Sequence, residues 1–216
     1  PQVDGVKLSH FKNEMLETRS STTVRKYLLL ISRAITVGQK ELGVPMFSNP
    51  VKQVTLPKEP AHRDRVLTEA ERLNLYKACE NNPIYFMREF VELLFETLLR
   101  RGELLALKYE DCNLLDKTAL IRETKNDKPR RIGLSIRAVE IIKSMPRNVS
   151  GELFITNGTS WFEKCFKRAV AKAGLSNFTM HDQRHCGATY LAEQGWSTQE
   201  LMAQGGWRSA EMVKKY

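Results

Sequence analysis

Two histidines and an arginine lie close together in the stretch His181-Asp182-Gln183-Arg184-His185. Their spacings of three and four residues would place all three side chains on one face of a helix. An arginine offers a fixed fork of donors for phosphate oxygens, and a histidine can exchange a proton near neutral pH. The stretch therefore predicts a site for an anion, although a short grouping of this kind is by itself more often a solvated helix face.

The charge of the chain indicates a kind of partner. Its 216 residues carry 34 Lys and Arg against 25 Asp and Glu, a formal net charge of +9. Such an excess favours a polyanion, with nucleic acid first and an acidic membrane surface second. The length is enough for one large domain, or for a large and a small one.

The cysteines and the apolar runs bear on the cellular compartment. Cys79, Cys112, Cys165 and Cys186 are widely spaced, without a C-x-x-C pair or a histidine at metal-ligand spacing. We therefore expect reduced thiols in a cytoplasmic protein. No signal peptide is visible, and no apolar run approaches the roughly 18 residues of a membrane helix. Because the sequence starts without Met, we expect a piece of a longer protein.

The elements that must position the cluster divide into two predicted domains. Residues 1–45 are expected to be helical, with an N-cap at residues 20–22 before an apolar stripe of helical period. Four prolines between Pro45 and Pro60 have the composition of a linker. We expect a helical domain over 1–48, a linker over 49–61 and the main domain over 62–216.

The main domain is predicted to be α+β, so the fold class is mainly α with a small antiparallel β-sheet or hairpin plus a helical N-terminal domain. Capping boxes at Thr68/Glu71 and Ser160/Glu163 indicate two helix starts. Two short strand-like runs flank a turn at 125–129, which indicates a hairpin. Helices are expected at 68–80, 83–98, 135–145, 160–173, 181–194 and 198–204, strands at 118–122 and 130–134, and a helical turn or two at 209–216.

Five separated pieces of the main domain together resemble the tyrosine recombinases, the phage-integrase family. Their order, spacing and residue types agree over about 62–216, and the preceding helices look like the lower part of the family's core-binding domain. The pieces are Thr97-Leu98-Leu99-Arg100 with the following Arg101-Gly102-Glu103, the first arginine box; Lys125 with Arg130 and Arg131, the β-hairpin lysine; His181 to His185, the H-x-x-R box; Gly205-Gly206-Trp207, the box with His or Trp; and Tyr216, nine residues beyond Trp207, at the nucleophile.

The resemblance implies a site-specific DNA recombinase that conserves phosphodiester energy in a covalent 3′-phosphotyrosine intermediate. Tyr216 would attack the scissile phosphate, and Arg100 and Arg184 would clamp its non-bridging oxygens. Lys125 would protonate the leaving 5′-oxygen. Further roles are a donor N–H from Trp207, handling of the tyrosine proton by His181, a buttress at His185, and orientation of the arginines by Glu103. No cofactor or metal is needed.

The partner implied is double-stranded DNA at a specific site, expected to be an inverted repeat bound by a homo-tetramer in a bacterial, phage or plasmid context. A basic clamp made by both domains would hold the duplex through phosphate contacts. Each basic residue alone is more often part of a solvated face. The candidates for DNA contact are Arg19, Arg25, Lys26, Arg33, Lys128, Arg130 and Arg131.

Several residues depart from the family pattern, and other functions remain open. The family's glycine before the first arginine is Leu98 here, and the apolar third residue of its H-D-L-R-H box is Gln183. Lys128 could take the place of Lys125. A type IB topoisomerase shares the active-site pattern and relaxes DNA without exchanging partners, and a regulator could keep the fold without catalysis. A metal-dependent nuclease lacks a visible ligand set.

Overall fold

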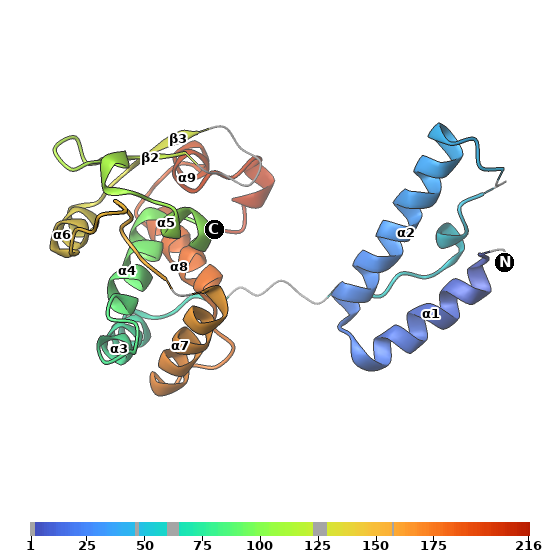
Figure 1. Cartoon of the computed structure of the whole chain (residues 1–216), viewed down its shortest axis with the longest axis horizontal. Helices are drawn as coiled ribbons and strands as arrows, with labels where there is room; N and C mark the ends of the chain where they lie inside the picture. Colours follow the sequence, from blue (N-terminus) through green and yellow to red (C-terminus); the bar gives the residue numbers. More distant parts are fainter. Residues whose placement is uncertain (1–2, 46–47, 60–64, 123–128, 157) are drawn as a thin grey trace. The chain divides into compact units, whose positions relative to one another are not determined.

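The computed structural model describes residues 3–45, 48–59, 65–122, 129–156 and 158–216. The chain forms two compact units, residues 1–64 and 65–216 (Figure 1). Among the described residues, no helix is long and apolar enough to cross a membrane. Each unit has its own hydrophobic core.

The first unit is a helical hairpin made by α1 (Gly5–Thr18) and α2 (Ser21–Glu41). Ser20 caps α2 as predicted, because its hydroxyl accepts a hydrogen bond from the Thr23 amide. The apolar faces of the two helices meet in a small core. Its fully buried members on α2 are Val24 and Leu28.

The predicted linker begins later in the structure than at residue 49. The 3₁₀-helix η1 (Pro50–Gln53) packs against both α1 and α2, and Val51 and Val54 are buried in their core. The Asn49 side chain is buried too, and its amide donates to the Ser32 carbonyl at 2.8 Å. Although its composition is typical of a linker, the segment from Asn49 to Val54 packs in the core of the first unit.

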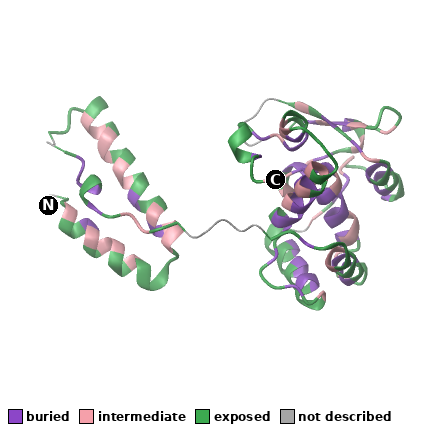
Figure 2. Cartoon of the chain, turned by 180° about the vertical axis from the view of Figure 1, so that it is seen from behind, coloured by how far each residue is buried: buried purple, intermediate pink, exposed green. Residues whose placement is uncertain are grey.

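The second unit is built around α4 (Met87–Thr97), which packs on α3, α6 and α8 and buries most of its residues (Figure 2). Its apolar residues cover most of the helix surface, while Arg88, Glu92 and Glu96, spaced four apart, share the remaining face. The other helical elements are α3 (Glu69–Glu80), α5 (Arg101–Leu105), η2 (Tyr109–Asp111), α6 (Ile136–Ser144), α7 (Thr159–Lys172), α8 (Met180–Glu193), α9 (Thr198–Gly205) and η3 (Ala210–Met212).

A small antiparallel sheet of order β1-β2-β3 covers one side of this unit. The predicted hairpin is formed by β2 (Thr118–Ile121) and β3 (Arg130–Gly133), with Ala119 opposite Ile132. A third strand, β1 (Cys112–Asn113), was not predicted, because two residues carry no readable alternation. The predicted hairpin tip lies mostly outside the described residues. The mainly helical fold with a small antiparallel sheet is thus confirmed.

Two helices begin differently from what their sequence signals predicted. The central helix α4 begins at Met87 rather than at Pro83, because the Asn82 side chain accepts from the Ile84 amide and forms a turn there. The start of α7 was predicted from a capping box that is not formed. Its carboxylate, Glu163, instead forms an ion pair with Arg101.

The close approach of α8 to α4 depends on Gly187. A Cβ at this position would lie 2.2 Å from the Phe95 carbonyl oxygen and 2.7 Å from a Leu98 methyl carbon. Gly187→Ala should therefore push the helices apart and lower the free energy of unfolding by about 1 to 3 kcal/mol, measured by urea denaturation. Gly102→Ala is the matched control, because a Cβ there meets nothing within 4 Å. Equal loss in both variants would contradict the packing described.

Candidate active site

The start of α8 fixes the depth of the predicted anion-binding cluster. Thr179 is the N-cap, and its amide donates to the Asp182 carboxylate at 2.8 Å while its hydroxyl accepts from the Asp182 amide at 3.3 Å. This reciprocal cap starts the helix at Met180, one residue before the predicted position. Arg184 then points into the protein from the second turn and is 1% exposed.

Arg184 is a buried cation, and not all of its hydrogen-bond donors have partners among the described residues. Its Nε and Nη1 are buried and have no hydrogen-bond partner among the described residues. Its guanidinium lies 4.2 Å from the centre of the Trp207 ring. Burial, and then the charge of Arg100, lowers the pKa of Arg184 to about 10, so it still carries its charge at neutral pH. Buried unpaired donors are costly, which makes this guanidinium a strong partner for an anion.

Arg100 is held at the start of α5 by Glu103. The Arg100 amide donates to Glu103 Oε2 at 2.9 Å, and its Nη1 donates to Oε1 at 2.7 Å. Its Nη2 donates to the Gly206 carbonyl at 3.0 Å. Burial would raise the pKa of Glu103, but hydrogen bonds from Arg130 and Arg100 outweigh it and keep the pKa below its usual range. Glu103 thus orients Arg100, as predicted from its spacing.

The turn after α9 places the Trp207 ring against Arg184. Gly206 adopts a left-handed conformation with φ of 68° and caps α9. A Cβ on Gly205 would lie 2.0 Å from the Trp207 ring, so the indole folds back over this glycine. Trp207 is buried with Leu98 in a small apolar cluster. The two glycines are therefore needed for the ring to reach Arg184.

Tyr216 reaches the cluster from the segment after η3. Its hydroxyl forms a hydrogen bond with His185 Nδ1, and its ring centre lies 5.5 Å from that of Trp207. The His181 and His185 rings meet edge to face at 4.5 Å. The imidazole on the tyrosine is thus His185, which was expected only to buttress, while His181 was expected to handle the proton. Burial raises the pKa of Tyr216 above its usual value, so a base must assist its ionisation.

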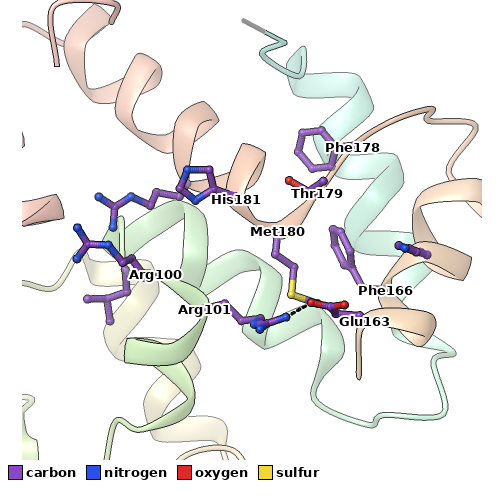
Figure 3. Close-up of a pocket in the computed structure, with 11 residues that line it drawn as sticks. Arg100, Arg101, Glu163, Phe166, Phe178, Thr179, Met180 and His181 are labelled. Atoms are coloured by element: carbon purple, nitrogen blue, oxygen red, sulfur yellow. Dashed lines mark hydrogen bonds and ion pairs between the residues drawn. The ribbon is translucent and has the colours of Figure 1, made fainter. Parts of the chain in front are cut away.

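A cavity of about 420 Å³ is lined by Arg100, His181 and Arg184 together with apolar side chains. Arg100 and His181 lie at one end, with Phe166, Phe178 and Met180 toward the other (Figure 3). An ion pair between Arg101 and Glu163 borders the same cavity. Both arginines are paired with a carboxylate, Arg100 with Glu103 and Arg101 with Glu163, so these ion pairs do not distinguish which of the two is catalytic.

The model of the phage integrase family matches residues 65–216. The chain belongs to the phage integrase family. It is 34% identical over 200 residues to the shufflon-specific DNA recombinase of Escherichia coli, covering 91% of this chain and 51% of the relative. It is 25% identical over 212 residues to the integrase of Salmonella phage P22, covering 90% and 53%. The chain thus spans about half the length of these curated relatives.

Solved structures of integrases share the fold. A lambda integrase dimer bound to a COC' core site matches with a TM-score of 0.80 at 21% identity, covering 98% of this chain and 81% of that one. The Tn1549 transposon integrase in complex with a circular intermediate DNA matches with a TM-score of 0.80 at 18% identity, covering 100% and 81%. At these identities the likeness concerns the fold.

Two departures of this integrase-family chain from the family pattern have structural explanations. Leu98 keeps the left-handed conformation that suits the family's glycine, with φ of 56°. The strain costs about 1 to 3 kcal/mol, and complete burial of the leucine side chain offsets it with about 1.5 to 3 kcal/mol. Gln183 is fully buried, and its amide donates to the Tyr76 hydroxyl at 3.1 Å and to the Val91 carbonyl at 3.3 Å. It therefore ties α8 to α3 and α4.

The predicted DNA contacts are placed differently from one another. Three of the four in the first unit, Arg19, Lys26 and Arg33, are exposed, but Arg25 donates to the Pro57 carbonyl at 3.3 Å. Arg131 is exposed on the hairpin. Lys125 and Lys128 lie outside the described residues, so the predicted lysine acid has no described position.

Sequence reasoning missed the place of Arg130, which lies in the active-site cluster rather than on an outer face. A signal was present. Arg130 and the buried Ile132 are two residues apart on β3, and strand residues with that spacing share a face. Arg131 then belongs to the opposite face. The sequence does not show what the Arg130 face of β3 packs against, because this depends on the distant turn at Gly205 and Gly206.

A titration tests the environment of His181. Desolvation, and then the Arg184 charge, lowers the pKa of His181 below its usual value, so the imidazole is neutral at pH 7. We expect an NMR midpoint below 6.5 for its ring protons. Arg184→Gln should move this midpoint upward, and a bound DNA phosphate should do the same by adding negative charge. An unchanged midpoint in Arg184→Gln would contradict the proximity of the two side chains.

Proposed function

We propose that the chain is the DNA-cleaving and rejoining part of a site-specific tyrosine recombinase. One observation carries this proposal: Arg184, whose buried Nε and Nη1 have no hydrogen-bond partner among the described residues, lines the same cavity as Arg100. Arg184 also lies on the same helix as His185, which binds the Tyr216 hydroxyl. The cluster combines an anion clamp with a nucleophile and its base. The family and its recombinase relatives support the same reaction.

The proposed reaction is a transesterification. Tyr216 loses its proton to His185 and its oxygen attacks the scissile phosphorus. A bond to the 3′-phosphate forms, the bond to the 5′-oxygen breaks, and that oxygen leaves as a hydroxyl with a proton from Lys125. Arg100 and Arg184 offset the negative charge that develops on the non-bridging oxygens. Reversal of the steps with another 5′-hydroxyl joins new partners without an external energy source.

The positive charge for this transition state comes from guanidinium groups, so we propose that no metal ion takes part. Within the part of the chain that the structure describes, no group of three or more His, Cys, Asp or Glu could hold a metal. Cleavage should accordingly persist in EDTA.

The partner proposed is duplex DNA at an inverted repeat, bound by four protomers. A net charge of +9 and the exposed Arg19, Lys26, Arg33 and Arg131 would supply phosphate contacts. Solved integrases of this fold include a dimer bound to a core site and a complex with a circular intermediate DNA.

Covalent capture on fragments of the source replicon tests the proposal. The 216-residue chain is incubated with DNA and denatured, and the protein-linked ends are sequenced. Adducts at a 3′ phosphate that cluster at one inverted repeat would support a recombinase. Adducts scattered over all sequences would favour a type IB topoisomerase, and binding without any adduct would favour a non-catalytic regulator.

A further inference from the structure

Both terminal nitrogens of Arg130 are engaged by the active-site frame, while its buried Nε has no hydrogen-bond partner among the described residues. Its Nη1 and Nη2 donate to the two oxygens of Glu103 at 3.1 and 2.9 Å, which is a two-pronged ion pair. Its Nη2 also lies 3.4 Å from the Gly205 carbonyl oxygen. A Cβ on Gly206 would fall 2.7 Å from the Arg130 Cζ, so the guanidinium packs directly on this glycine. The side chain is only 14% exposed.

These contacts leave Arg130 poorly placed to bind a DNA backbone. A phosphate would have to displace Glu103, whose carboxylate is 4% exposed and would become a buried, partly unpaired charge. The adjacent Arg131 has the opposite situation, because it is exposed and its Nη1 makes one contact, to the Thr118 hydroxyl at 3.3 Å. The two neighbouring arginines therefore have different tasks.

The contacts of Arg130 lead to both arginines of the anion clamp. Glu103 holds Arg100 through its amide and its guanidinium, and Arg100 in turn donates to the Gly206 carbonyl. The next residue after Gly206 is Trp207, whose ring stacks on Arg184. Arg130 thus fixes the carboxylate on one side and the glycine turn on the other.

We infer that Arg130 is a positioning residue for strand cleavage, which sets Arg100 through Glu103 and Trp207 through the glycine turn, and is not a DNA contact. The inference rests on the proposed function. Since Arg130 is the first residue of β3, it also joins this strand of the hairpin to the anion clamp. Side chains that orient the residues in contact with the reacting group typically contribute about 10- to 100-fold to activity.

The test compares Arg130→Gln with Arg131→Gln and with Lys143→Gln, an exposed charge-matched control on α6. Single-turnover cleavage is measured on a duplex recovered by covalent capture, at saturating DNA. We expect Arg130→Gln to lower this rate about 10- to 100-fold with unchanged DNA affinity and salt dependence. Arg131→Gln should instead weaken DNA binding and reduce the slope of log K against log salt by about 0.9. Lys143→Gln should change none of these quantities.

Two further variants separate positioning from simple loss of fold or charge. Arg130→Lys keeps the charge but not the fork, so it should stay impaired. In a Glu103→Gln background, Arg130→Gln should lower the rate further by much less than it does alone, because both act through one carboxylate. A wild-type cleavage rate in Arg130→Lys would overturn the inference, as would additive effects of Arg130→Gln and Glu103→Gln. A cleavage rate of Arg130→Gln that returns to the wild-type value at higher DNA concentration would also overturn it, because the defect would then lie in DNA binding.

Binding of inorganic vanadate, a phosphate analogue, tests the inference without cleavage. The wild-type chain should bind vanadate, and Arg130→Gln should weaken that binding about tenfold or more while Lys143→Gln does not. If the wild type and the variants bind vanadate as expected but no DNA adduct ever forms, the proposed function fails. The role of Arg130 in positioning the anion clamp then still stands. If the wild type does not bind vanadate, or Arg130→Gln binds it equally well, the positioning role is wrong.

Discussion

Tyr216→Phe is expected to abolish the covalent DNA adduct, with a loss of at least about 10⁴-fold in cleavage. The substitution removes the oxygen that is proposed to attack the phosphate, together with its hydrogen bond to His185. The ring remains, so its packing against Trp207 and the fold should persist. Adduct formation on a radiolabelled duplex, followed by denaturing gel electrophoresis, measures the effect.

Tyr190→Phe is the matched control for this variant. Tyr190 also lies on the second unit and packs its ring near Phe95, but it takes no part in the cluster around Arg184. Its loss of a hydroxyl should leave the adduct yield unchanged. A Tyr216→Phe protein that still forms the adduct would show that another residue attacks the phosphate.

Arg184→Ala should lower cleavage by about 10² to 10³-fold or more and leave DNA affinity within a few-fold. Two nitrogens of the buried guanidinium have no hydrogen-bond partner among the described residues, and the proposed function assigns them to the phosphate, so the substitution should remove stabilisation of the transition state. Affinity depends on many phosphate contacts, of which this is one. Arg184→Lys should be almost as impaired, because an ammonium cannot reproduce the fork.

Arg168→Ala on α7 is the control for removal of an arginine from this unit, since Arg168 is exposed and lies over Trp161. Thermal unfolding of all three variants establishes that each is folded. An Arg184→Ala protein that cleaves at the wild-type rate would refute the clamp. Equal losses of cleavage and DNA affinity would make Arg184 a binding residue instead.

The sequence was sufficient to predict the elements whose signals are local. The caps at Ser20 and Thr68 begin helices as expected, and the hairpin strands follow their apolar alternation. The pairing of Glu103 with Arg100 also follows from a spacing of three residues at a helix start. These interactions need only neighbouring residues, so their patterns remain readable.

The remaining features depend on contacts between distant segments. The burial of Asn49 requires Ser32, Glu163 prefers Arg101 to its own helix cap, and Arg130 pairs with a carboxylate from another element. Periodicity and composition contain none of this information. The contact of the Tyr216 hydroxyl with His185 rather than with His181 has the same cause, because it depends on where the segment after η3 brings that hydroxyl.

The most direct test of the central claim is peptide mapping of the trapped protein–DNA adduct by mass spectrometry. The protein is incubated with DNA under single-turnover conditions, so that one round of cleavage can take place. The adduct is then digested with nuclease and protease, and the modified peptide is sequenced. The account predicts a nucleotide attached through its 3′ phosphate to Tyr216. A nucleotide on any other residue, or a linkage through a 5′ phosphate, would contradict it.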